Sequence, residues 1–163
     1  MPVIISLAAL FLSVAFLQLS SGAIGPLDVL SGLQEGFTTG QVGLLGSAHF
    51  AGFFVGCWWA PRLMGDVGHN RAFAAFAAAG TIGALAHPLI LDPIAWAALR
   101  VMTGLSVAGC YTVVEAWLQA KVTNQTRGRV LGIYRVVDLG ASLVAQLMIG
   151  VLEPASYVSY NIL

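Results

Sequence analysis

The chain has 163 residues, of which 58% are hydrophobic and only 9% are charged, whereas roughly 25% of residues are charged in a typical soluble domain. Its seven basic and seven acidic residues cancel, so the chain has no excess positive charge with which to attract nucleic acid. Together with a mean hydropathy of +0.87, these values exclude an ordinary soluble domain and a nucleic-acid-binding protein, and they favour a membrane protein.

Three long segments contain no Lys, Arg, Asp or Glu: residues 1–27, 36–61 and 72–91. Each is long enough for a helix to cross about 30 Å of hydrocarbon at about 1.5 Å per residue. The first segment also lacks the basic residues with which a secretory signal peptide begins, so we expect it to remain in the membrane. The sequence therefore predicts an all-α membrane protein, a bundle of five to six transmembrane helices.

Turn-forming residues between the apolar segments predict where each span ends. Glycines surround Glu35 after the first span, Pro61 ends the second, and Asp92 with Pro93 separates the third from the fourth. We expect one transmembrane helical domain over residues 1–163. Its spans should cover about residues 2–29, 41–61, 72–91, 94–120 and 130–152, with the start of a sixth span at 155–163.

The distribution of charge among the connections predicts the orientation of the spans. Five basic residues lie in or at the edges of the connections after the second and fourth spans: Arg62, Arg71, Lys121, Arg127 and Arg129. The other three connections contain Glu35, Asp92 and Glu153 and no Lys or Arg. Because basic connections stay in the cytoplasm, we expect a multi-pass protein with a cytoplasmic N-terminus.

Ionisable side chains inside the predicted spans are costly unless they are paired or hydrated, so each suggests a function. Glu115 and Arg135 lie at similar distances from the cytoplasmic ends of their spans, and we expect them to form a pair. Arg100 and Asp28 both lie toward the outer side and are predicted to form a second pair. Such pairs either hold helices together or serve a substrate or proton pathway, and the sequence leaves both interpretations open.

Three spans carry polar or small residues at intervals of three or four, which places them on one helix face that should look inward. These residues are Gln18, Ser21, Gly25 and Asp28 on the first span, Arg100, Gly104, Ala108, Tyr111 and Glu115 on the fourth, and Arg135, Asp138, Ser142, Gln146 and Gly150 on the fifth. Glycines such as Gly52, Gly56 and Gly104 should let the helix backbones approach closely.

Two runs of the sequence resemble motifs of a known family. The run GCWWAPRLMGDVGHNR resembles the loop motif between the second and third helices of the major facilitator superfamily of transporters, although Gly65 stands where that family usually has Asp and Asp66 follows it. The residues assigned to this motif are Gly56, Pro61, Arg62, Asp66, Gly68, His69 and Arg71. The run RVMTGLSVAGCYTVVEAW resembles the fourth-helix motif, with Arg100 and Gly104 in matching positions. With RGRVLGIYRVVDLGA, the pattern is most similar to a little-characterised bacterial subgroup.

The resemblance implies that the chain is the N-terminal half of a twelve-helix secondary transporter of the bacterial inner membrane. Such a protein carries a small-molecule substrate by alternating access between two halves, and the C-terminal half is missing here. The resemblance also implies proton coupling through Arg100. Candidates for the substrate or proton pathway are Gln18, Asp28, Arg100, Tyr111 and Glu115. For Gln18 and Tyr111 the competing interpretation is a hydrogen bond that only holds helices together.

Two other classes of protein are weighed against a transporter. A membrane enzyme would need clustered catalytic groups, but His49, His69 and His87 are scattered along the chain, so we expect no enzymatic activity, no metal and no cofactor. A small non-transporting membrane scaffold or assembly partner would also suit a short chain. A reading frame that continues past Leu163 would favour the transporter.

Overall fold

The computed structural model describes residues 7–163, and within that range the chain forms helices and no strands. The helices are α2 (Ala8–Gln34), α3 (Thr39–Val67), α4 (His69–Ala86), the 3-10 helix η1 (His87–Leu89), α5 (Pro93–Lys121), α6 (Arg127–Ile149) and α7 (Tyr157–Ile162). Five of them, with η1 counted as part of the α4 segment, are long and apolar enough to cross a membrane. The predicted class, an all-α bundle with five spans and the start of a sixth, is confirmed.

Pro61 does not end the second span as the sequence predicts. Pro26 lies inside α2, which continues to Gln34, and Pro61 lies inside α3, which continues to Val67. A proline removes one backbone donor, and a long helix tolerates that loss when the hydrogen bonds on both sides persist. The predicted polar connection over residues 62–71 is therefore wrong. Its only non-helical residue is Gly68, with φ 84°, a conformation that glycine adopts at little cost.

The remaining boundaries lie within a few residues of the predicted ones. The third span ends in η1, whose first turn contains Pro88. The fifth span begins at Arg127 and ends at Ile149. Two helix starts are capped by side chains: the Thr38 hydroxyl accepts from the Gln41 N–H, and Asp92 Oδ1 accepts from the Ala95 N–H at 2.8 Å. The predicted first residue of the first span, Pro2, lies outside the described residues.

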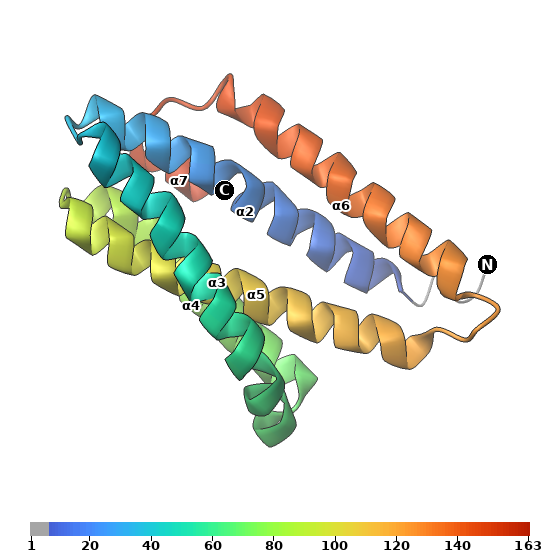
Figure 1. Cartoon of the computed structure of the whole chain (residues 1–163). Helices are drawn as coiled ribbons and strands as arrows, with labels where there is room; N and C mark the ends of the chain where they lie inside the picture. Colours follow the sequence, from blue (N-terminus) through green and yellow to red (C-terminus); the bar gives the residue numbers. More distant parts are fainter. Residues whose placement is uncertain (1–6) are drawn as a thin grey trace.

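The long helices run alternately in opposite directions. The connections α2–α3, α4–α5 and α6–α7 gather at one end of the bundle, and α3–α4 and α5–α6 lie at the other (Figure 1). The most extensive contacts join α5 to α3 and to α4, while α6 packs along α2. The short helix α7 returns beside α2 near the first end (Figure 1).

Helices α3 and α5 cross at backbone contact because of their glycines. A Cβ atom added to Gly52 would come within 1.9 Å of the Val101 carbonyl oxygen, and one added to Gly104 within 2.0 Å of the His49 carbonyl oxygen. No larger residue fits at either position without separation of the helices. The predicted role of these glycines in close helix packing is confirmed, and the crossing fixes the part of α5 that carries Arg100.

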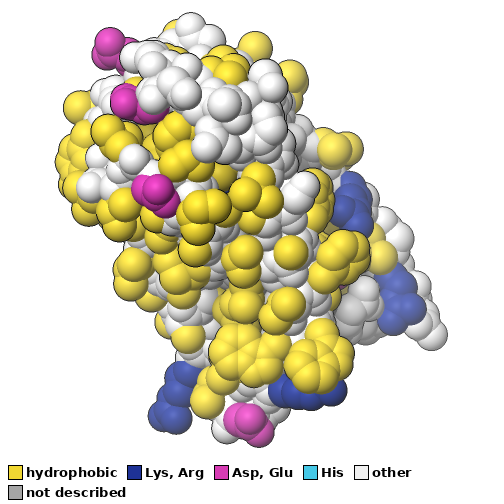
Figure 2. Space-filling view, turned by 60° about the vertical axis from the view of Figure 1, so that its left-hand side comes forward, with side chains coloured by type: hydrophobic (Ala, Val, Ile, Leu, Met, Phe, Trp, Pro, Cys, Tyr) yellow, Lys and Arg dark blue, Asp and Glu magenta, His cyan; other side chains and the backbone are white. Residues whose placement is uncertain are grey.

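The surface has a broad band of hydrophobic side chains between two polar ends. Figure 2 shows most of the acidic side chains on this face at one end of the band and the basic side chains toward the other, where one acidic side chain also lies. Large apolar side chains such as Phe54 and Val136 are more than two thirds exposed. An apolar band of this kind suits contact with lipid rather than with water.

Candidate functional site

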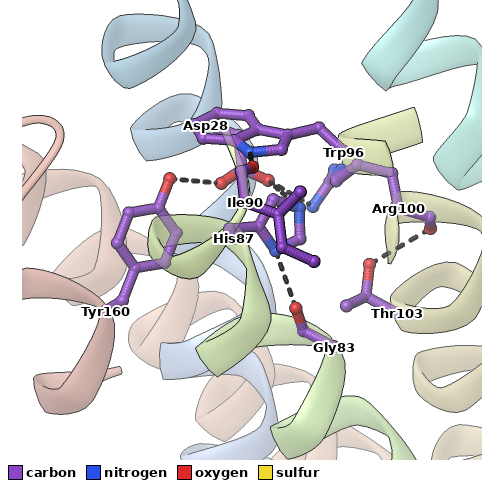
Figure 3. A network of polar contacts seen from close by, with 8 residues as sticks. All are labelled: Asp28, Gly83, His87, Ile90, Trp96, Arg100, Thr103 and Tyr160. Atoms are coloured by element: carbon purple, nitrogen blue, oxygen red, sulfur yellow. Dashed lines mark hydrogen bonds and ion pairs between the residues drawn. The ribbon is translucent and has the colours of Figure 1, made fainter. Parts of the chain in front are cut away.

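A buried group of polar side chains lies near the end of the bundle where α2, η1, α5 and α7 meet (Figure 3). We call it the Asp28 cluster, and it consists of Asp28, His87, Arg100 and Tyr160. Asp28 Oδ1 accepts a hydrogen bond from the Tyr160 hydroxyl at 2.7 Å. Its other oxygen, Oδ2, lies 3.5 Å from Arg100 Nη1 and 3.4 Å from His87 Nε2. The predicted pairing of Asp28 with Arg100 is confirmed.

Local structure places each member of the Asp28 cluster. Asp92 caps α5, and Pro93 starts it with a fixed φ, so that Arg100 follows about two turns later. On α2, Gly25 leaves room for the guanidinium, because a Cβ at that position would lie 3.4 Å from Arg100 Nη2. The Trp96 indole donates to the carbonyl oxygen of Ile90 at 2.6 Å and so ties the start of α5 to the end of η1.

The imidazole of His87 is held on three sides. Nδ1 lies 2.7 Å from the carbonyl oxygen of Gly83, one helical turn earlier. The ring stacks on Tyr160 with centroids 5.9 Å apart and meets the edge of Trp96 at 5.2 Å. His87 is fully buried, Asp28 is 1% exposed and Arg100 is 6% exposed, so the cluster is closed to solvent.

The Asp28 cluster does not use all of its hydrogen-bonding capacity. Arg100 Nε and Nη1, Asp28 Oδ2 and His87 Nε2 are buried and form no hydrogen bond within the described residues. Unsatisfied donors and acceptors of this kind are rare in folded proteins and often mark a functional site. The contacts of Oδ2 at 3.4 and 3.5 Å are ion-pair distances, longer than hydrogen bonds.

A second polar group, the Asp138 cluster, joins α2, α5 and α6 and consists of Gln18, Tyr111, Arg135 and Asp138. The Tyr111 hydroxyl donates to Asp138 Oδ1 at 2.8 Å and also contacts Gln18 Oε1. Arg135 Nη1 lies 3.7 Å from Asp138 Oδ2, but the Arg135 side chain is 65% exposed. Gln18 and Tyr111, predicted as pathway residues, therefore lie together here and not in the Asp28 cluster.

Glu115 does not form the predicted pair with Arg135. It accepts a hydrogen bond from the Tyr134 hydroxyl at 3.2 Å, while Arg135 turns to Asp138 on its own helix. Glu115 and Arg135 both line a small cavity of about 250 Å³, so the predicted similarity in depth holds. The difference arises because consecutive helical residues point about 100° apart, and Tyr134 rather than Arg135 faces α5.

All residues of the predicted loop motif except Gly68 belong to helices rather than to a loop. Gly56 packs α3 on α5, since a Cβ there would lie 2.6 Å from the Leu105 carbonyl oxygen. Arg62 lies over the Trp58 ring at 4.0 Å, and His69 stacks on Trp117 at 5.9 Å. The other motif residues, Pro61, Asp66, Gly68 and Arg71, are exposed, and in the described part of the chain neither Asp66 nor Arg71 forms an ion pair.

A larger cavity of about 470 Å³ lies between α2, α4, α5 and α7. Its lining is mostly apolar, with Phe16 and Phe76, and it includes the hydroxyls of Ser20 and Ser106. None of the sequence-predicted site residues lines this cavity. In the range 7–163 no three His, Cys, Asp or Glu side chains are placed to hold a metal ion.

Two members of the Asp28 cluster, His87 and Tyr160, are absent from the sequence-based candidates. His87 lies at the end of an apolar segment and next to a proline, which suggests a turn rather than a site. Tyr160 belongs to α7, a helix of six residues that is too short to show a hydrophobic period. The signal in the sequence that could have identified His87 is its predicted depth in the membrane, which is the same as that of Asp28 and Arg100.

Comparison with curated proteins identifies relatives over most of the chain. It is 29% identical over 148 residues to proteins named "Uncharacterized MFS-type transporter YcaD" from Escherichia fergusonii and from Escherichia coli strains O45:K1 and O81. The matches cover 91% of this chain and 38% of each relative, so the chain spans less than half the length of these proteins. No family model matches the chain, and no solved structure matches it.

Proposed function

From the homology of this chain to MFS-type transporters, we propose that it forms the N-terminal half of a secondary transporter of the bacterial inner membrane. The observation that carries the proposal is the similarity to transporters over 91% of the chain. The protein moves a small-molecule substrate by alternating access, in which one half rocks against the other around a site near the middle of the bilayer. Lipid and the C-terminal half are the partners of this chain.

The arrangement of charge supports an N-terminus in the cytoplasm. Alternating helices put the connections α3–α4 and α5–α6 at the same end of the bundle (Figure 1), and the helix ends beside these two connections carry Arg62, Arg71, Lys121, Arg127 and Arg129. A membrane-impermeant thiol reagent tests this orientation on single cysteines introduced at Glu35 and Arg127, with Cys57 and Cys110 replaced by Ser. We expect labelling from opposite sides, and labelling of both from one side would contradict the topology.

The residues assigned to the pathway occupy two depths. We assign proton handling to Asp28 and Arg100, because a buried ion pair with unsatisfied donors can change its protonation or its partner. We assign substrate contact to Gln18, Tyr111 and Glu115, which are only partly buried or exposed in this half. Those side chains would face the polar cavity between the two halves.

Transport is tested with the complete polypeptide in proteoliposomes. We expect an imposed pH gradient to drive uptake of at least one solute from a panel of sugars, amino acids, organic acids and drugs. The Arg100→Ala variant should lose the pH-driven component, while Arg129→Ala, which changes an exposed basic residue in the first turn of α6, should keep it. Uptake by Arg100→Ala that still follows the pH gradient would contradict proton handling by Arg100.

A non-transporting scaffold is separated from a transporter by the size of the native polypeptide. The chain itself has a mass of 17.0 kDa and matches only 38% of its relatives' length. An antibody raised against the Glu35 connection should detect a polypeptide more than twice this size in native membranes. Detection at about 17 kDa alone would favour the scaffold.

A further inference from the structure

We infer that Asp28 and His87 form a proton-binding site that holds one proton between His87 Nε2 and Asp28 Oδ2. The two atoms lie 3.4 Å apart, both are buried, and neither forms another hydrogen bond within the described residues. Figure 3 shows the imidazole between Gly83 on one side and the carboxylate on the other. The inference follows from counting hydrogens on the two ring nitrogens.

The first step concerns Nδ1. It lies 2.7 Å from the carbonyl oxygen of Gly83, which can only accept a hydrogen bond. Nδ1 must therefore carry a hydrogen. A neutral imidazole has a hydrogen on only one nitrogen, so a neutral His87 would direct the lone pair of Nε2 toward Asp28.

The second step concerns Asp28. An ionised carboxylate only accepts hydrogen bonds, so a neutral His87 and an ionised Asp28 would place two lone pairs against each other in a buried site. A bridging water would need about 2.8 Å to each atom and would separate the two atoms by about 4.5 Å, which exceeds the observed distance. A proton must lie between them, either as imidazolium with carboxylate or as carboxylic acid with neutral imidazole.

The third step concerns the other charged and titratable groups around the pair. From α5, Arg100 Nη1 lies 3.5 Å from the same oxygen, Oδ2, and the guanidinium keeps its positive charge. From α7, Tyr160 donates its only hydroxyl hydrogen to Oδ1, so it has none to give to His87. From α3, the His49 backbone packs on Gly104, one helical turn after Arg100 on α5. With the shared proton, the Asp28 cluster carries a net charge of about +1.

The arrangement makes Arg100 a competitor for the proton. Nη1 and Nε of Arg100 have no hydrogen-bond partner within the described residues. Nη1 lies 3.5 Å from Asp28 Oδ2, and a small movement toward that oxygen would bring it to hydrogen-bonding distance. A closer guanidinium stabilises the ionised carboxylate and favours release of the proton. Under the proposed function, on which this step rests, a movement of α5 against α2 would release the proton that the transporter carries.

Spectroscopy on the intact protein in lipid nanodiscs at pH 7 tests the site without a substrate. Of the three histidines in this chain, His49 and His69 are replaced with Gln, and the signals of His87 are those that a further His87→Gln change removes from the spectrum. We expect either the nitrogen-15 signals of a doubly protonated imidazole, or an infrared carboxylic-acid band that disappears in Asp28→Asn. A bare Nε2 together with an ionised Asp28 would overturn the inference.

A coupling measurement separates a shared proton from two independent groups. Both signals are followed across a pH series. The His87→Gln change should either eliminate the carboxylic-acid band of Asp28 or shift the pH at which this band disappears by about one unit or more. The Asp28→Asn change should likewise either eliminate the signal of the proton on His87 Nε2 or shift the pH at which that proton is lost by about one unit or more. Tyr157→Phe, a change at an exposed residue of α7, should move neither. Unchanged pH profiles would overturn the inference, whereas failure of pH-driven uptake with a coupled pair would overturn the proposed function alone.

Discussion

The Asp28 cluster and the Asp138 cluster have similar chemistry but very different surroundings. Each contains a carboxylate, an arginine and a tyrosine, and each joins α2 and α5, with α6 added in the Asp138 cluster and η1 and α7 added in the Asp28 cluster. The arginine side chain is 7% exposed in the Asp28 cluster and 65% exposed in the Asp138 cluster. Because the Asp28 cluster is buried, loss of any one of its charged partners leaves another charge buried without a counter-ion. In the Asp138 cluster, solvent that reaches the exposed arginine weakens the ion pair.

The largest effect is expected from removing the shared carboxylate. Asp28→Ala leaves Arg100 and His87 buried without their counter-ion, which should lower the free energy of unfolding by about 3 to 5 kcal/mol. Asp138→Ala should cost less than about 1 kcal/mol, because its arginine partner is mostly exposed. Reversible unfolding in mixed micelles measures both variants, and equal losses would remove the distinction between the two clusters.

The next effect is expected from one hydroxyl group. Tyr160→Phe removes the hydrogen bond of 2.7 Å to Asp28 Oδ1 and should cost about 1.5 to 3 kcal/mol, because the acceptor is a buried group that otherwise goes unpaired. The matched change Tyr134→Phe removes the longer bond of 3.2 Å to the exposed Glu115 and should cost less. The same unfolding measurement compares them, and a larger loss for Tyr134→Phe would reverse the ranking.

Helix crossing gives a comparable but distinct effect. Gly104→Ala places a methyl group 2.0 Å from the His49 carbonyl oxygen and should cost about 1 to 3 kcal/mol as α3 and α5 separate near Arg100. Gly140→Ala on α6 meets no neighbouring atom within 4 Å and should be neutral or stabilising by up to about 1 kcal/mol. Thermal unfolding followed by circular dichroism tests the pair; similar melting temperatures would mean that the crossing adapts.

The smallest effect is expected from removing the exposed ion pair of the Asp138 cluster. Arg135→Gln removes an ion pair of 3.7 Å within one helix and should change stability by less than about 0.5 kcal/mol. Raising the salt concentration should change the stability of Arg135→Gln no more than that of the unmodified protein. A loss comparable to that of Tyr160→Phe would show that Arg135 has a buried partner in the complete protein.

The sequence predicts the parts of the fold that depend on depth in the membrane. Charge-free segments locate the first three spans, turn-forming and polar residues bound the other two, and counting along the spans brings Asp28 to the level of Arg100. Depth alone does not determine which way a side chain points around its helix, so the expected contact of Glu115 with Arg135 is replaced by one with Tyr134. Proline rules derived from shorter helices also misplace the end of α3, since local signals do not include support from neighbouring helices.

Contacts between distant segments limit the prediction of the site. His87 reaches Asp28 only because η1 turns the end of the α4 segment toward α2, and Tyr160 reaches it only because α7 returns beside α2. Neither event leaves a periodic pattern in the sequence. Unsatisfied donors on Arg100 likewise appear only when all neighbours are in place.

The single residue between α3 and α4 has a mechanical consequence. Gly68 is the whole connection between α3 and α4. Because the connection is one residue long, a tilt of the 29-residue helix α3 would also displace the start of α4. Helix α4 is about 27 Å long at 1.5 Å per residue, and the residue that follows its other end is His87, whose imidazole lies beside Asp28. A displacement of α3 at this end of the bundle would therefore move the side chain of His87 at the other end, if α4 moves as a rigid body.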